Sequence, residues 1–222
     1  MRIEAFRPDG DAPRYFGVYP AIVTDITRDT DNLGRIEVKF PWLGAAGNDA
    51  RALATLCTPY ADDDQGFEMI PAVGSQVVVA FEAGNLSRPY IIGACWNGQE
   101  KLPETAQTPN NKRLIKTRSG SLLEFDDTEG APKVTISTQS GHKLVLDDGQ
   151  QEVRFTHSNG CTIKMNAAGQ VSINANASLE VNAPAVNVHS GVAQFDGLIQ
   201  CQSLITNAVV SSSYTPGAGN IW

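Results

Sequence analysis

The sequence predicts an all-β protein in two parts, a small closed barrel followed by an elongated domain of stacked repeats. Five short strand-like segments lie between residues 17 and 98, without a helical pattern among them. From residue 117 onward a short motif recurs. Within that motif large apolar residues alternate with polar ones, and a period of two is typical of strands.

The repeated motif begins with a glycine in each copy, at Gly120, Gly141 and Gly160. Large apolar residues follow three and five positions later, and a second apolar pair closes each copy. Self-similarity at a period of about 20 residues indicates stacked units that bury their apolar faces against one another. The predicted core positions are Leu123, Phe125, Val134, Ile136, Leu144, Leu146, Val153, Phe155, Ile163, Met165, Val171 and Ile173.

The N-terminal segments predict an OB-fold, a five-stranded barrel whose closure removes the sheet edges that would otherwise aggregate. Ile36, Val38 and Phe40 alternate with charged residues, as in a half-buried strand. A polar arm, residues 1–16, precedes the predicted barrel domain of residues 17–98. The expected strands cover residues 18–27, 34–41, 52–58, 75–82 and 89–96.

The bulk composition argues against several classes of protein. The chain has 222 residues, 41% of them hydrophobic and 18% charged, and its formal net charge is −7. Nucleic-acid backbones are bound by clustered Lys and Arg, so this acidic balance disfavours a nucleic-acid partner. No apolar run approaches the roughly 18 residues of a transmembrane helix. There is no N-terminal signal segment, and we expect assembly in the cytoplasm.

The residue types of common catalytic and metal sites form no motif. The four cysteines are far apart and show no CxxC spacing, so we expect reduced thiols. The sequence contains no phosphate loop and no EF-hand spacing, and no Ser, His and Asp set stands out. We therefore predict neither an enzyme nor a bound cofactor.

Several short sequence segments follow one another in an order that is informative about family. DNLGRIEVKFPW at 31–42 is followed by PAVGSQVVVAFE at 71–82 and SRPYIIG at 87–93. The order continues into the repeats with KTRSG at 116–120 and LEFDD at 123–127. In this order and spacing the strings resemble the phage baseplate assembly protein V family and the related spike of type VI secretion (VgrG).

The resemblance implies that three chains together build an intertwined β-helical prism, here over residues 117–213, after a linker at 99–116. The repeats support this independently, because two large apolar residues per strand are too few for a core within one chain. Around a threefold axis one face of each strand would be buried and the other wet. The positions expected on the wet face are Glu124, Thr135, Arg154, Lys164 and Ser172.

The function implied by the resemblance is mechanical. A homotrimeric spike would stand at the baseplate tip of a virion tail or a contractile injection particle, attached to a hub protein at the front of the inner tube. It would contact the tube and other baseplate proteins only indirectly, and would pierce the target envelope. Some phage spikes carry a lysozyme domain at the linker, and this linker is too short to hold one.

The C-terminal end breaks the repeat pattern. We expect residues 214–222 to cap the tip or to bind a PAAR-like tip protein, through Tyr214, Ile221 and Trp222. Some family spikes bind an axial metal through a His-x-His pair, which this chain lacks. His189 is the one candidate ligand, but it points outward if Val186 and Val188 face the axis.

Two other functions are left open by the sequence. An OB-fold nucleic-acid-binding protein would stack bases on aromatic residues near the strands. A β-helical polysaccharide-degrading enzyme would use carboxylates along the repeats. Neither accounts for the repeats and the barrel strings together.

Overall fold

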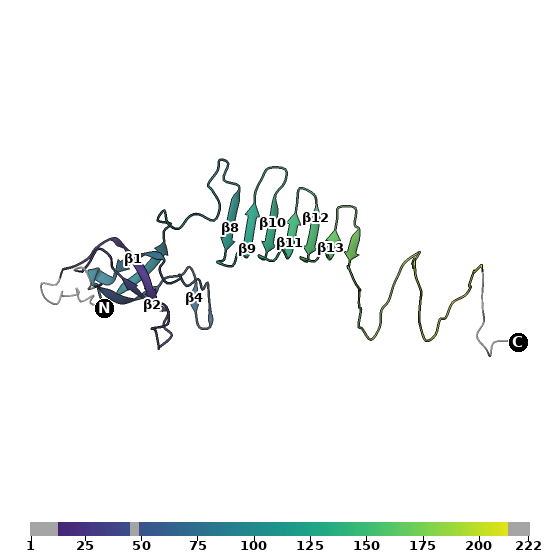
Figure 1. The fold of residues 1–222 in the computed structure, drawn as a ribbon, viewed down its shortest axis with the longest axis horizontal. Helices are drawn as coiled ribbons and strands as arrows, with labels where there is room; N and C mark the ends of the chain where they lie inside the picture. The colour runs from purple at the N-terminus through teal and green to yellow at the C-terminus, as the bar shows by residue number, and fades with distance from the viewer. Residues whose placement is uncertain (1–12, 45–48, 213–222) are drawn as a thin grey trace, which may run out of the picture.

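The computed structural model describes residues 13–44 and 49–212 (Figure 1). Its strands form a closed barrel, a small hairpin and a seven-stranded sheet, and the all-β prediction is confirmed. In the described residues, one short 3-10 turn, η1 (Glu82–Gly84), follows the barrel strand β6 (Gln76–Phe81). No helix in the described ranges is both long and apolar enough to cross a membrane.

The barrel closes in the strand order β1-β2-β3-β7-β6. Neighbouring strands are antiparallel except β3 and β7, which pair in parallel and complete the closure. The five predicted strands are all present, and their ends lie within two residues of the predicted ones. They are β1 (Val18–Asp25), β2 (Arg35–Lys39), β3 (Arg51–Leu56), β6 (Gln76–Phe81) and β7 (Pro89–Ala94), with the hairpin β4 (Ala61–Asp62) and β5 (Gln65–Gly66) between β3 and β6.

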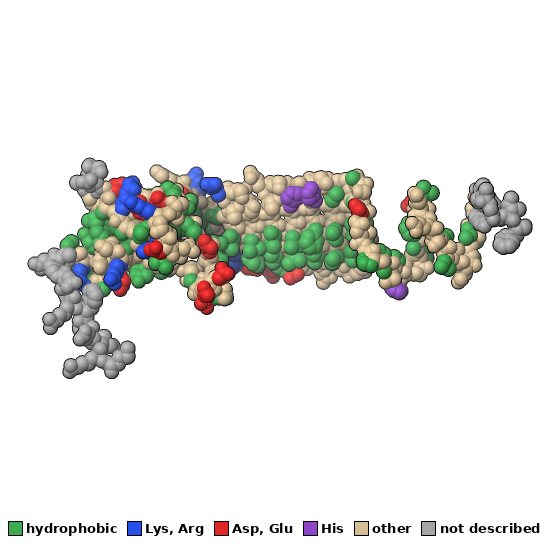
Figure 2. Space-filling model, turned by 90° about the horizontal axis from the view of Figure 1, so that it is seen from below, with side chains coloured by type: hydrophobic (Ala, Val, Ile, Leu, Met, Phe, Trp, Pro, Cys, Tyr) green, Lys and Arg blue, Asp and Glu red, His purple; other side chains and the backbone are tan. Residues whose placement is uncertain are grey.

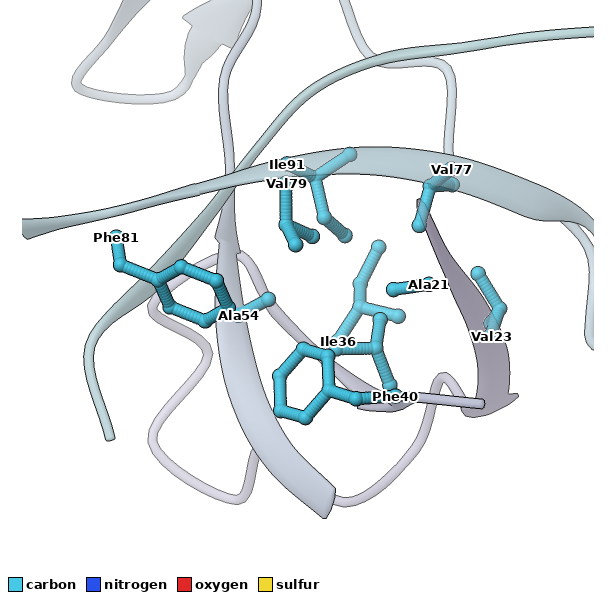
Figure 3. Packing of buried hydrophobic residues seen from close by; sticks show 10 residues of the cluster. Ala21, Val23, Ile36, Phe40, Ala54, Val77, Val79, Phe81 and Ile91 are labelled. Carbon is cyan, nitrogen blue, oxygen red and sulfur yellow. The ribbon is translucent and has the colours of Figure 1, made fainter. Parts of the chain in front are cut away.

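One apolar cluster fills the barrel (Figure 3). Phe40, Val79 and Ile91 come from three different parts of the barrel and are each exposed by 1% or less. Burial of each such side chain contributes roughly 1.5–3 kcal/mol to folding. The partly buried rings of Tyr15 and Trp42 pack against this cluster and extend it, and their ring centroids lie 5.3 Å apart. The barrel therefore has a core of its own.

A carboxylate holds the turn between β1 and β2. Asp29 accepts hydrogen bonds from the backbone N–H groups of Leu33 and Arg35, at 2.7 and 2.9 Å. The Arg35 guanidinium also donates to Asp29, and these bonds lower the pKa of that carboxyl. Asp29, two residues before the DNLGRIEVKFPW string, is thus part of a clamp that fixes where β2 begins.

The repeats form the second sheet, in which each strand is antiparallel to the next along the chain. Each predicted copy of the motif is one hairpin of this meander. β8 lies within the range predicted as a linker, and it pairs with β9 along its length. The strands are β8 (Lys112–Lys116), β9 (Leu122–Asp126), β10 (Lys133–Ser137), β11 (Lys143–Asp147), β12 (Glu152–Thr156), β13 (Thr162–Met165) and β14 (Val171–Asn174).

The three repeat glycines occupy equivalent turns along one side of this sheet, where the strands end, and we call this side the glycine edge. Gly120, Gly141 and Gly160 have φ of +87°, +94° and +93°. Each donates its backbone N–H to the carbonyl of the residue three positions earlier. Left-handed backbone of this kind is accessible to glycine without the steric cost of a Cβ atom. The glycines therefore set where one hairpin ends and the next begins.

After β14 the chain runs away from the sheet in a zigzag (Figure 1). Residues 175–212 form no strand, and large apolar side chains such as Leu179, Val186 and Phe195 are exposed. The predicted tip residues Tyr214, Ile221 and Trp222 lie outside the described residues, as does the arm before residue 13.

Candidate functional site

The strand register places all twelve predicted core residues on one face of the β8–β14 sheet, in two rows across the strands. Figure 2 shows this face as a continuous apolar band along the sheet. Ile115 of β8 extends the first row by one strand. The first row contains Leu123, Ile136, Leu144, Phe155, Ile163 and Ile173, and the second contains Phe125, Val134, Leu146, Val153, Met165 and Val171.

This apolar band has no cover from the described part of the same chain. Phe125 and Phe155 are each 45% exposed, and Ile173 is 53% exposed. The buried core cluster, in contrast, lies wholly within the barrel. A continuous apolar face of this kind on a folded domain marks an interaction surface. Its role as the centre of a trimer stays a prediction.

The opposite face of the sheet is polar and ion-paired. Glu124, Thr135, Arg154, Lys164 and Ser172, the positions predicted to be wet, all lie in one row on this face. Lys112 lies 3.7 Å from Glu124 between charged atoms, and Lys133 lies 3.6 Å from Asp126. The sheet therefore has one face suited to a protein partner and one suited to water.

Two carboxylates on the polar face are largely buried, at 7% exposure each. Glu152 accepts hydrogen bonds from Lys164 and Arg154, and these bonds lower its pKa against the opposing effect of burial. Asp126 accepts from the hydroxyl and the backbone N–H of Thr128, and its pKa is also lowered. Both groups are thus held in the charged form.

The lowered pKa values predict that the sheet loses stability in acid. A depressed pKa in the folded state contributes stability above the ordinary value, which is 4.5 for Glu, and this contribution disappears as the pH falls through the folded value. We expect Glu152→Gln to lower the melting temperature at pH 7 and to flatten the fall of the melting temperature as the pH drops below 4.5. Thermal melting monitored by circular dichroism checks this. The exposed Glu129→Gln should behave as the wild type, and a Glu152→Gln profile parallel to the wild type would contradict the assignment.

The structure also brings together two histidines that the sequence pattern does not connect. His142 directly precedes β11 and His157 directly follows β12, and their ring centroids are 4.3 Å apart. The sequence identifies His157 only as a turn residue, and the pairing appears only once the β11–β12 register is known. The sequence did contain a signal for this contact. Each histidine belongs to a glycine turn, and the two turns lie at the same end of the adjacent strands β11 and β12.

Metal and catalytic chemistry have little support in the described residues. Within them, no group of three or more His, Cys, Asp or Glu side chains is arranged to hold a metal ion. His189 lies exposed in the strand-free segment, and its role as a metal ligand stays untested. The four cysteines are free thiols.

A groove on the barrel bears on the nucleic-acid alternative. Arg35, Arg51 and Arg88 line it together with Tyr90. Each of these arginines is already ion-paired with a carboxylate of the same chain. Phosphates would have to compete with these carboxylates, so the groove does not favour a nucleic-acid partner.

Comparison with known families agrees with this two-part architecture. Residues 19–96 match the type VI secretion system and phage-baseplate injector OB domain. Residues 112–180 and 133–193 match the phage baseplate V C-terminal trimerisation domain. The chain belongs to the phage baseplate V and VgrG spike family. Both matched modules are structural, which agrees with the prediction that the chain is not an enzyme.

Curated relatives from this family share low sequence identity with the chain. The type VI secretion system spike protein VgrG5 of Pseudomonas aeruginosa is 25% identical over 172 residues, which is 72% of this chain and 22% of the relative. The spike protein VgrG3 of Vibrio cholerae is 24% identical over 130 residues, 55% of this chain and 13% of the relative. The chain thus spans less than a quarter of the length of these relatives. The protein is a VgrG-like structural component of a phage baseplate or a type VI injection apparatus.

Proposed function

We propose that three copies of this spike-family chain associate through the apolar face of the β8–β14 sheet and form the needle of a membrane-piercing central spike. The observation that carries this proposal is the two-row apolar band on a sheet whose other face is ion-paired. The match to a trimerisation domain over the same residues supports it. Three such sheets facing one axis bury all twelve apolar positions and leave the charged rows in water.

The segment beyond the sheet supports a shared structure as well. Residues 175–212 are extended and form no strand within the chain, while their large apolar side chains are exposed. Such a segment has little to bury alone, and winding with two other copies supplies both the apolar contacts and the backbone partners. The needle domain then covers residues 117–213, with β8 joined to it. Interwoven chains separate slowly, so the needle resists force through kinetic stability.

The barrel is proposed to act as a collar over residues 17–98, joined to the needle by a linker at residues 99–116. It would attach to a hub protein at the front of the inner tube, and its match to the injector OB domain supports a place in such an apparatus. Contraction of the sheath would then drive the needle into the target envelope. A PAAR-like tip protein would bind residues 214–222, and contacts with tube and baseplate proteins would be indirect.

The proposed assembly predicts the mass of the particle in solution. One chain is 23.8 kDa, so light scattering on a sizing column should give three times this, about 71 kDa. We expect the trimer to survive warm detergent, because dissociation requires the shared core and the wound segment to separate together. A mass of one chain at micromolar concentration would contradict the proposal.

A further inference from the structure

A histidine pair borders the apolar band at the glycine edge of the sheet. His142 follows Gly141 directly, and His157 lies across from it in the extension of the β11–β12 pairing. The two rings are 4.3 Å apart between centroids and tilted by 48°. Figure 2 shows histidine side chains beside the apolar band, on the side of the sheet that faces the viewer.

The pair lies where the proposed trimer would be joined. His142 and His157 line an open depression of about 520 Å³ that also contains Phe155, Ile163 and Ile173 of the apolar face. In a three-sheet needle the edge of each sheet meets a neighbouring copy, so this depression lies against the joint between copies. A change of charge there acts on the assembly as well as on the single sheet.

The hydrogen bonds of the pair require neutral rings. Nδ1 of His142 accepts from the backbone N–H of Ser158 at 3.3 Å, and Nδ1 of His157 accepts from that of Asn159 at 3.2 Å. A nitrogen that accepts a hydrogen bond carries no proton, so each neutral ring carries its proton on Nε2. Protonation of both rings at Nδ1 removes both bonds and places two cations in contact.

No described residue that lines the depression can neutralise that charge. The other titratable groups lining the depression are Lys143, which is also cationic, and the thiol of Cys161. The remaining polar residues that line the depression lie at the ends of β12, β13 and β14 and are neutral: Thr156, Thr162 and Asn174. Among the described residues that line the depression, none is a carboxylate.

We propose that the His142–His157 pair is an acid-sensitive joint of the needle, packed and neutral near pH 7.5 and repelling near pH 5.5. Histidine is the side chain whose charge ordinarily changes in this range. The inference rests on the proposed trimer. It predicts a spike that is stiff in neutral medium and weakened in an acidified one, well above the pH at which the carboxylates of the polar face are protonated.

The repeats themselves provide the test variant. Ser121 occupies the position of His142 in the turn before the one that contains His142, and Thr138 occupies the position of His157 in the turn before the one that contains His157. The double variant His142→Ser with His157→Thr therefore copies residues that this sheet already uses. The rate of trimer dissociation in warm detergent is measured at pH 7.5 and 5.5. We expect the wild type to dissociate about tenfold faster or more at pH 5.5, from lost hydrogen bonds and added repulsion. The double variant should show nearly equal rates, and His189→Asn should match the wild type.

The outcomes separate the joint from the assembly. A wild-type trimer with equal rates at the two pH values would overturn the joint and leave the trimer standing, as would a double variant that keeps the full acid effect. A wild-type protein that is monomeric at pH 7.5 would overturn the proposed function and the joint together. If the double variant does not assemble, His157→Asn, which copies Asn166 in the following turn, takes its place in the same comparison.

Discussion

Leu144→Asp is expected to abolish the trimer and to leave a monomer with an intact barrel. Leu144 lies in the middle of the first apolar row, directly between Ile136 and Phe155 on the neighbouring strands. In the proposed needle the change places three carboxylates near one buried axis. Burying an unpaired charge costs several kcal/mol per ion, more than a shared core can offset at three positions at once.

The adjacent residue provides a matched control for this change. Val145 lies on the polar face, between Thr135 and Arg154. Val145→Asp introduces the same carboxylate one residue along the strand, where Arg154 is a neighbour, and it should leave the trimer at about 71 kDa by light scattering. A normal trimer in Leu144→Asp would show that the apolar band does not face the axis, and loss of the trimer in both variants would show that the strand, not its face, is sensitive.

The period-two pattern was sufficient to assign the repeat residues to the two faces of their sheet. In β6, whose sequence is apolar from Val77 to Phe81, Val77, Val79 and Phe81 are buried and the residues between them are half-buried, because successive side chains in a strand point to opposite faces. The same rule assigns Leu144 and Val145 to different faces. Short glycine turns preserve the register from one hairpin to the next, so an alternation read within each strand extends across the whole sheet.

Features that depend on cross-strand neighbours could not be predicted in this way. β8 has a single large apolar residue on the band, Ile115, among basic residues, so its sequence resembles a linker. Glu152 and Asp126 appear in the sequence as ordinary turn and strand-end acids, and their burial depends on partners from other strands. The His142–His157 contact likewise depends on the register of β11 and β12.

The strand-free segment differs from the sheet for a related physical reason. In residues 175–212 apolar residues are spaced irregularly among Ala, Asn and Ser, so no single strand pairing within the chain buries them. In the proposed trimer, regular structure there depends on contacts between copies, which the sequence of one chain encodes only through its small residues and its sparse apolar pattern.

Removal of residues 99–222 is expected to leave a soluble, folded barrel that no longer forms a stable trimer. The buried cluster draws its ten members from residues 21–91 alone, so the core remains intact without the needle. The cut precedes β8, because a fragment that kept this strand would expose an edge without its partner β9. The apolar band, by contrast, leaves with the needle.

The fragment is measured by light scattering and by thermal melting. We expect the mass of a single chain and a cooperative transition, and Phe40→Ala within the fragment should cost about 3–5 kcal/mol, because Phe40 is a large, fully buried side chain of the core. That loss shows that the fragment folds around the same core as the full chain. A fragment that remains a stable trimer would show that the collar drives assembly, and the apolar band would then be a consequence of trimerisation elsewhere and not its cause.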